Sequence, residues 1–162
     1  MKKLLLLFLL PIVLQAQNNP LAMFKPLQGG IWAAEGTWGD GSTFKQEIRV
    51  TFSLKDKIVK VNSKGFTNEA QTEFGLRNHG IRQYDPATKA VRFWEFDVFG
   101  NVTQGIVKQE GKNIIYSYDY GGTQVTEMWQ YKDENTYDFI VGIYKEGHWE
   151  QKFLETVFRR KK

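Results

Sequence analysis

The feature that most constrains the fold is a two-residue alternation of apolar and polar side chains, broken at short intervals by turn-forming residues. The alternation is clearest from Phe44 to Leu54, where even positions are mostly apolar and odd positions are charged or hydroxylated. Only a strand with one buried and one wet face needs this pattern. Such segments are rich in β-branched and aromatic residues and contain no proline. They are Ile31–Trp38, Thr43–Leu54, Lys57–Ser63, Thr72–Tyr84, Ala90–Phe99, Asn101–Gln109, Asn113–Tyr120, Thr123–Tyr131, Thr136–Tyr144 and His148–Arg159.

The breaks between these segments recur at the spacing of about 8–12 residues that is typical of sandwiches and barrels. Turn chemistry supports them, because Asp85-Pro86 begins a type I turn and Gly121-Gly122 suits a tight hairpin. A helical period is absent except over Pro20–Gln28, where we expect one short helical turn. Long strands with short connections predict an up-and-down meander, and closing it removes exposed edges. We therefore predict an all-β fold, a single antiparallel barrel of about ten strands, with an open sandwich as the alternative.

The N-terminus resembles a secretory signal peptide. Lys2 and Lys3 precede an apolar run that is broken only by Pro11, and Ala16 supplies a small residue for cleavage. A membrane-spanning helix needs about 20 apolar residues, and this run is shorter. No cysteine follows the cleavage point to accept a lipid. We expect residues 1–16 to be a signal peptide, residues 17–162 to form one exported domain, secreted or periplasmic, and no stable membrane anchor to remain after cleavage.

Composition excludes several classes of function. The formal net charge is +4, but the basic excess lies mainly at the two ends of the chain. Without a clustered basic face, no nucleic-acid partner is expected. The chain has no cysteine, which excludes thiol catalysis, thiolate metal sites and disulfides. No pattern in the sequence sets an oligomeric state.

The stretch Gly30-Ile31-Trp32 opens the first predicted strand just after the short helical turn. This arrangement resembles the first-strand signature of lipocalins and related calycin barrels. The resemblance implies that Gly30 and Trp32 close one barrel end and that Arg159, or alternatively Arg160, packs over the indole through a cation–π contact.

The chain from about Leu27 to Arg160 also resembles uncharacterised secreted lipocalin-like barrel proteins of bacteria. That resemblance rests on the segments 27–32, 80–86 and 158–160, with Trp94 and Gly105 between them. This resemblance implies a barrel fold, but it does not indicate any enzymatic or binding activity.

A more distant similarity is to nitrobindin-type barrels, which bind haem through a histidine late in the last strand. Here Gln151–Arg160 contains no histidine, and His148 stands at the beginning of that strand. Haem is therefore not expected, and no other cofactor is indicated. The two histidines do not have the spacing of metal ligands, so no metal site is expected.

A ten-stranded barrel should enclose room for a small, largely apolar or amphipathic molecule. Strand parity predicts interior ligand-binding side chains, with a polar end where an acidic ligand group would meet Arg77. His79 has an alternative, solvent-facing placement beside a bend at Gly80. The predicted set is Arg77, His79, Phe93, Glu95, Trp129, Phe139 and Phe153.

Two other classes of function stay open. One is a structural or interaction domain with a packed interior, which would use exposed aromatic residues against a protein or glycan. The other is a hydrolase or isomerase, because Glu95 and Asp97 share a strand face about 7 Å apart, within the range of glycosidase carboxylates. A wet face opposite Trp94 and Phe96 is the simpler interpretation of that pair. No nucleophile, phosphate-loop or dinucleotide motif is present, so the sequence predicts no catalytic residue and favours binding over catalysis.

Overall fold

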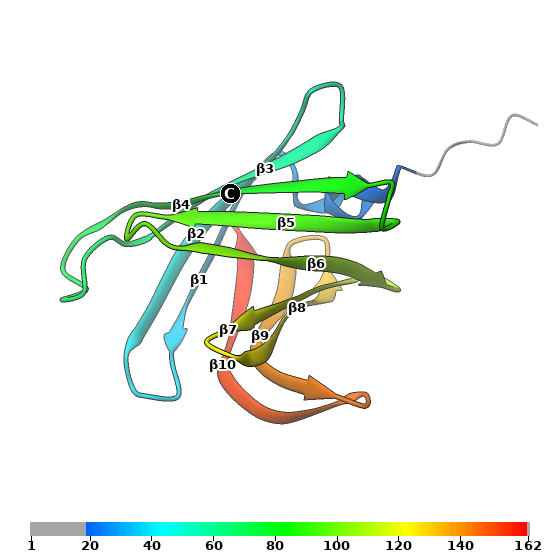
Figure 1. Ribbon diagram of the computed structural model, residues 1–162. Helices are drawn as coiled ribbons and strands as arrows, with labels where there is room; N and C mark the ends of the chain where they lie inside the picture. Colours follow the sequence, from blue (N-terminus) through cyan, green and yellow to red (C-terminus); the bar gives the residue numbers. More distant parts are fainter. Residues whose placement is uncertain (1–18, 162) are drawn as a thin grey trace, which may run out of the picture.

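A computed structural model describes residues 19–161 of the chain, so the predicted signal peptide at residues 1–16 lies outside the described range. Within that range no helix is long and apolar enough to cross a membrane. The short 3-10 helix η1 precedes ten strands (Figure 1). The elements are η1 (Pro20–Leu27), β1 (Ile31–Thr37), β2 (Thr43–Ser53), β3 (Ile58–Phe66), β4 (Phe74–Asp85), β5 (Ala90–Asp97), β6 (Val102–Glu110), β7 (Asn113–Tyr120), β8 (Thr123–Asp133), β9 (Thr136–Lys145) and β10 (His148–Arg160).

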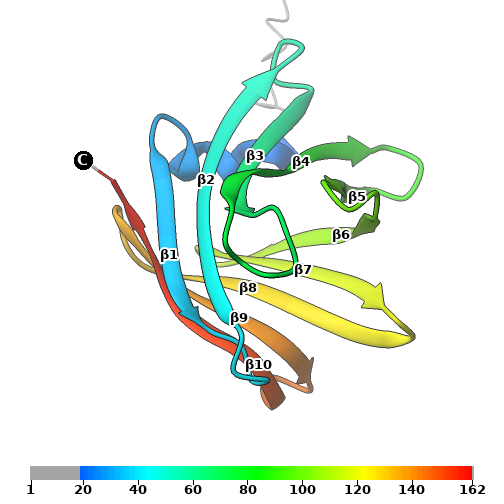
Figure 2. The same ribbon diagram turned by 90° about the vertical axis from the view of Figure 1, so that its left-hand side faces the viewer.

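The strands form one closed antiparallel barrel. Each strand pairs with the next in the chain, and β1 closes the sheet against β10 through the pair Trp32 and Arg160. The closed wall is visible in Figure 2, where β1 and β10 lie side by side. This confirms the predicted all-β antiparallel barrel, excludes the open sandwich and is consistent with a lipocalin-like architecture.

The predicted strands and turns are present, with ends that shift by a few residues. Gly111, Gly121 and Gly122 adopt φ values of 60°, 60° and 82°, which a side chain would disfavour. The carboxylate of Asp85 accepts from the backbone N–H of Ala87 at 3.0 Å and fixes the turn between β4 and β5. Local turn chemistry therefore sets the strand order without help from longer connections.

One end of the barrel is closed by η1 and the first strand (Figure 2). Phe24 and Leu27 of η1 are buried, and the indole N–H of Trp32 donates to the Leu27 carbonyl at 2.9 Å. Below the indole, Trp129 and Phe158 stack with ring centroids 4.4 Å apart. The aromatic core therefore closes this end of the barrel against solvent.

The arginine that covers Trp32 is Arg160, which corrects the assignment of that role to Arg159. The guanidinium carbon of Arg160 lies 4.5 Å from the centroid of the Trp32 ring, and its Nη1 donates to the Gln28 carbonyl at 3.0 Å. Arg159 pairs with Ala33, one position out of phase, and is exposed. Gly30 leaves room for this arginine, because a Cβ there would lie 2.8 Å from Nη1 of Arg160.

β-Bulges in β4 and β10 shift which side chains face the interior. In β4, Ser63 of β3 pairs with Asn78 and the next residue of β3 pairs with Leu76, so Arg77 is the extra residue. Arg77 and Asn78 therefore both face inward, and inward positions after the bulge are even-numbered. Two similar shifts interrupt β10, one of them between Lys152 and Leu154.

Candidate functional site

The barrel interior contains two adjoining chambers. The inner chamber, of about 170 Å³, lies towards η1 and is lined in part by Phe93, Glu95 and Trp129. The outer chamber, of about 190 Å³, lies towards the β1–β2 and β3–β4 loops. A cavity of about 150 Å³ holds one benzene molecule, so each chamber has room for a group of about one ring. The side chains that line both chambers are Gln46, Tyr118 and Glu127.

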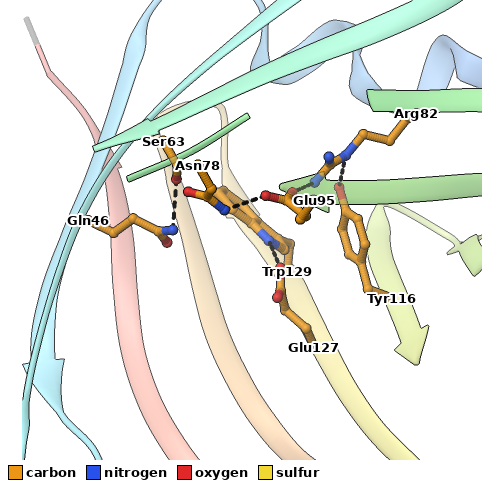
Figure 3. A network of polar contacts seen from close by, with 8 residues as sticks. All are labelled: Gln46, Ser63, Asn78, Arg82, Glu95, Tyr116, Glu127 and Trp129. Atoms are coloured by element: carbon orange, nitrogen blue, oxygen red, sulfur yellow. Dashed lines mark hydrogen bonds and ion pairs between the residues drawn. The ribbon is translucent and has the colours of Figure 1, made fainter. Parts of the chain in front are cut away.

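A buried ion pair crosses the inner chamber from β4 to β5 (Figure 3). Arg82, only 4% exposed, donates through Nη2 to Oε1 of Glu95 and through Nε to the Tyr116 hydroxyl at 3.2 Å. The Asn78 side-chain amide donates to the other oxygen of Glu95. Both carboxylate oxygens of Glu95 are therefore occupied, and its charge is balanced.

The absence of a side chain at Gly80 makes room for this ion pair. Gly80 pairs with Glu95 across the sheet, between the inward positions of Asn78 and Arg82. A Cβ at Gly80 would lie 2.1 Å from Nη1 of Arg82 and 2.6 Å from Oε1 of Glu95. Any larger residue there would displace the ion pair.

Burial and charge act in opposite directions on this network. Burial alone lowers the pKa of Arg82, but the charge of Glu95 and the contacts with Tyr116 offset it, so the pKa stays above its ordinary value. Burial raises the pKa of Tyr116 to about 12, against the charge of Arg82. The guanidinium is therefore charged and the phenol neutral at neutral pH.

Two polar atoms of the network have no partner among residues 19–161. They are Nη1 of Arg82, a donor, and Oδ1 of Asn78, an acceptor. Buried polar groups in folded proteins are nearly always hydrogen-bonded. The network thus has one unused donor and one unused acceptor beside the inner chamber.

Glu127 faces both chambers and is the least compensated charge of the interior. Its only hydrogen bond is a long one of 3.3 Å from the indole N–H of Trp129, and no described cationic side chain forms an ion pair with it. Burial raises the pKa of Glu127 to about 7, and the negative charge of Glu95 adds to the effect. The carboxyl group therefore changes its charge near neutral pH.

The structure places five of the seven predicted ligand-binding residues along the chambers. Phe93, Glu95 and Trp129 line the inner chamber, and Arg77 and Phe139 line the outer one. Arg77 is held by the Phe66 carbonyl and lies 5.0 Å from the Phe99 ring centroid.

His79 and Phe153 do not line either chamber. His79 is exposed, and its Nδ1 lies 2.7 Å from Oδ1 of Asn62 on the outer face of β3. Phe153 is partly buried against the core at the bulge of β10. The exposed position of His79 confirms its alternative, solvent-facing placement, and the bulge of β10 takes Phe153 out of the inward series.

Glu95 and Asp97 do not form a carboxylate pair. Asp97 accepts from the backbone N–H groups of Phe99 at 3.0 Å and Asn101 at 2.8 Å, which fastens it to the turn after β5. The face shared with Glu95 is the interior one, so the interpretation as a wet face is also wrong. The outward residue Phe96 is 49% exposed.

The set of ligand-binding residues predicted from the sequence contains neither Arg82 nor Glu127. Arg82 was not among the predicted residues, and its inward direction depends on the bulge at Arg77, which the residue pattern does not show. Glu127 did leave a signal, since it is the one charged residue in the inward series Val125, Glu127, Trp129. A charged residue on an otherwise apolar face indicates a buried charge, which is costly unless a partner compensates it.

Within residues 19–161, no three histidine or carboxylate side chains gather as metal ligands. A comparison with protein-family models finds no matching family. A comparison with curated protein sequences also finds no match. Fold and site together define a closed ten-stranded antiparallel barrel with a charged, partly hollow interior, consistent with a lipocalin-like barrel.

Proposed function

We propose that this chain is an exported, calycin-type barrel that binds a small amphipathic molecule in its two interior chambers. The observation that carries the proposal is the combination of open interior volume with buried polar atoms that lack partners. A packed structural core would fill such volume and satisfy such atoms.

The size of the chambers sets the affinity to expect. One aromatic ring buries about 150 Å², which corresponds to about 4 kcal/mol at 25 cal/mol per Å². One hydrogen bond to a charged group adds about 1.5–3 kcal/mol. Dissociation constants between about 0.1 mM and 10 μM follow for single-ring ligands, so ligands should be screened at concentrations up to about 1 mM.

Ligand binding is tested by native mass spectrometry of the purified protein and by the fluorescence of Trp129, whose ring lines the inner chamber. A small amphipathic molecule should co-purify or change the emission on titration. Thr103→Leu, which fills part of the inner chamber, should weaken binding. Gln104→Leu is the matched control, because Gln104 is the next residue of β6 and is exposed. Equal binding by both variants and the wild type would contradict an interior site.

Export is tested on the full chain with its own N-terminus, expressed in a bacterium. The mature protein should begin at Gln17 and appear outside the cytoplasm. A product that keeps Met1 and stays in the cytoplasm would refute this part of the proposal.

A second candidate, an interaction domain, is favoured by exposed apolar side chains near the turn between β5 and β6. Phe96 of β5 pairs with Val102 of β6, and they are 49% and 54% exposed. Adjacent exposed apolar residues of this kind mark interaction surfaces. Phe96→Ser with Val102→Ser should then abolish retention on cell-wall glycan or a partner protein and leave interior binding intact. Unchanged retention would remove this candidate.

A further inference from the structure

We infer that the interior site takes a small organic cation, with its ammonium group against Glu127 and its ring against the surrounding aromatic side chains. This inference rests on the proposed function and names the chemical class of its ligand.

The first argument is the balance of charge in the interior. Arg82 and Glu95 compensate each other, which leaves Glu127 as the extra carboxylate. The two other cations along the outer chamber are engaged elsewhere. Lys45 pairs with Glu35 at 2.8 Å on the surface, and Arg77 donates to the Phe66 carbonyl. Glu127 forms no ion pair with a described side chain, so one ammonium group beside it would supply the direct counter-charge that it lacks.

The second argument is the kind of surface that surrounds Glu127. Tyr118, Phe139 and Trp129 line the same chambers, and the indole N–H of Trp129 already points at the carboxylate. Aromatic faces attract cations, and the attraction is stronger away from water. An anionic ligand would meet the same faces and the same carboxylate unfavourably.

The third argument is independent of Glu127 and concerns the rest of the ligand. Nη1 of Arg82 lacks an acceptor, and Oδ1 of Asn78 lacks a donor. Both residues line the inner chamber, and Arg82 is more than nine-tenths buried. A hydroxyl group both donates and accepts, so a hydroxyl on the ligand can pair with either of these atoms.

The pH dependence of binding follows from the groups that face Glu127. They are Glu95 on β5, Arg82 on β4, and Tyr116 and Tyr118 on β7, with Arg77 on β4 and Lys45 on β2 further along the outer chamber. The residues of β9 that line this chamber are apolar. Of these, Glu127 is the group with a pKa of about 7. Because the cation needs the ionised carboxylate, its affinity should rise about tenfold from about pH 6 to about pH 8.

The experiment compares three phenols with short side chains: tyramine, tyrosol and para-hydroxyphenylacetate. They share the ring and the phenolic hydroxyl and differ in a cationic, neutral or anionic end. Calorimetric titration of the wild type should give tyramine the highest affinity, at least about tenfold above tyrosol, which corresponds to about 1.4 kcal/mol. Glu127→Gln should remove this preference, and Glu73→Gln, at an exposed glutamate, should retain it.

Tightest binding of the anion, or a tyramine preference that survives in Glu127→Gln, would overturn the inference and leave the proposed function standing. A second outcome would overturn the inference but not the proposed function: none of the three phenols binds, while a co-purifying ligand is present and is lost in Thr103→Leu. Failure of both experiments would remove the proposed function as well.

Discussion

Replacing Glu127 by glutamine should make the protein more stable at pH 8 and no more stable at pH 4.5. The carboxyl group has a pKa of about 7 in the folded protein against an ordinary value of 4.5. The folded state therefore holds a proton that the unfolded state has lost between these pH values. Since the stability contributed by a raised pKa is present below the unfolded value, it is lost as pH rises through the folded value.

The magnitude follows from the size of the shift. Each pKa unit corresponds to about 1.4 kcal/mol, so the wild type should lose about 3 kcal/mol of unfolding free energy between about pH 4.5 and pH 7.5 through this one group. Glutamine keeps the shape and the acceptor for Trp129 without the charge. The variant should therefore exceed the wild type by about 3 kcal/mol at pH 8.

The assay is urea unfolding followed by tryptophan fluorescence, at half-unit steps of pH, with no ligand present. Glu73→Gln is the control, because the same chemical change is made at an exposed position. The difference between the two variants should open between about pH 5 and pH 7. A pH profile of Glu127→Gln that is parallel to that of the wild type, or lower stability at pH 8, would refute the account of Glu127 as an uncompensated buried charge.

Three further results are expected from stability measurements by denaturant unfolding. Glu95→Gln should cost about 3–5 kcal/mol because it leaves the guanidinium buried without a counter-charge, and the double variant with Arg82→Met should recover most of that loss; a double variant no more stable than the single one would contradict this. Gly105→Ala should destabilise strongly, since its Cβ would lie 2.1 Å from the carbonyl oxygen of Ser117, a backbone atom that cannot move aside; an unchanged unfolding midpoint would show that the strands separate easily. Arg160→Ala should cost about 1–3 kcal/mol through the lost cation–π contact and carbonyl bonds, whereas the same change at the exposed arginine before it should lie within about 0.5 kcal/mol of the wild type; equal losses would mean that neither arginine covers the barrel end.

The architecture was predictable because it depends on patterns that are local in sequence. Alternation fixes which face of a strand is buried, and turn residues fix where strands end. The pairing of Trp32 with an arginine of the last strand was also predictable in kind. Its exact partner depended on whether β1 and β10 meet in one register or the adjacent one, and that register is set by closure of the whole barrel.

The site was only partly predictable, because its geometry depends on bulges. Parity gave Phe93 and Glu95 correctly, since β5 pairs regularly along its length. Parity alone would turn His79 inward, but the β4 bulge turns it outward, which agrees with its alternative, solvent-facing placement. The ion pair between Arg82 and Glu95 could not be inferred either, because it needs two adjacent strands in register and the empty position of Gly80.

The bulge at Arg77 divides β4 into two halves whose side-chain phases are independent. The half before it, with Arg77, belongs to the mouth of the barrel, and the half after it carries Asn78 and Arg82 deep inside. Insertion or deletion of one residue at this point would reverse which side chains face inward at the mouth, and it would leave Asn78 and Arg82 in place. The entrance can therefore change its side chains without altering the recognition chemistry of the interior.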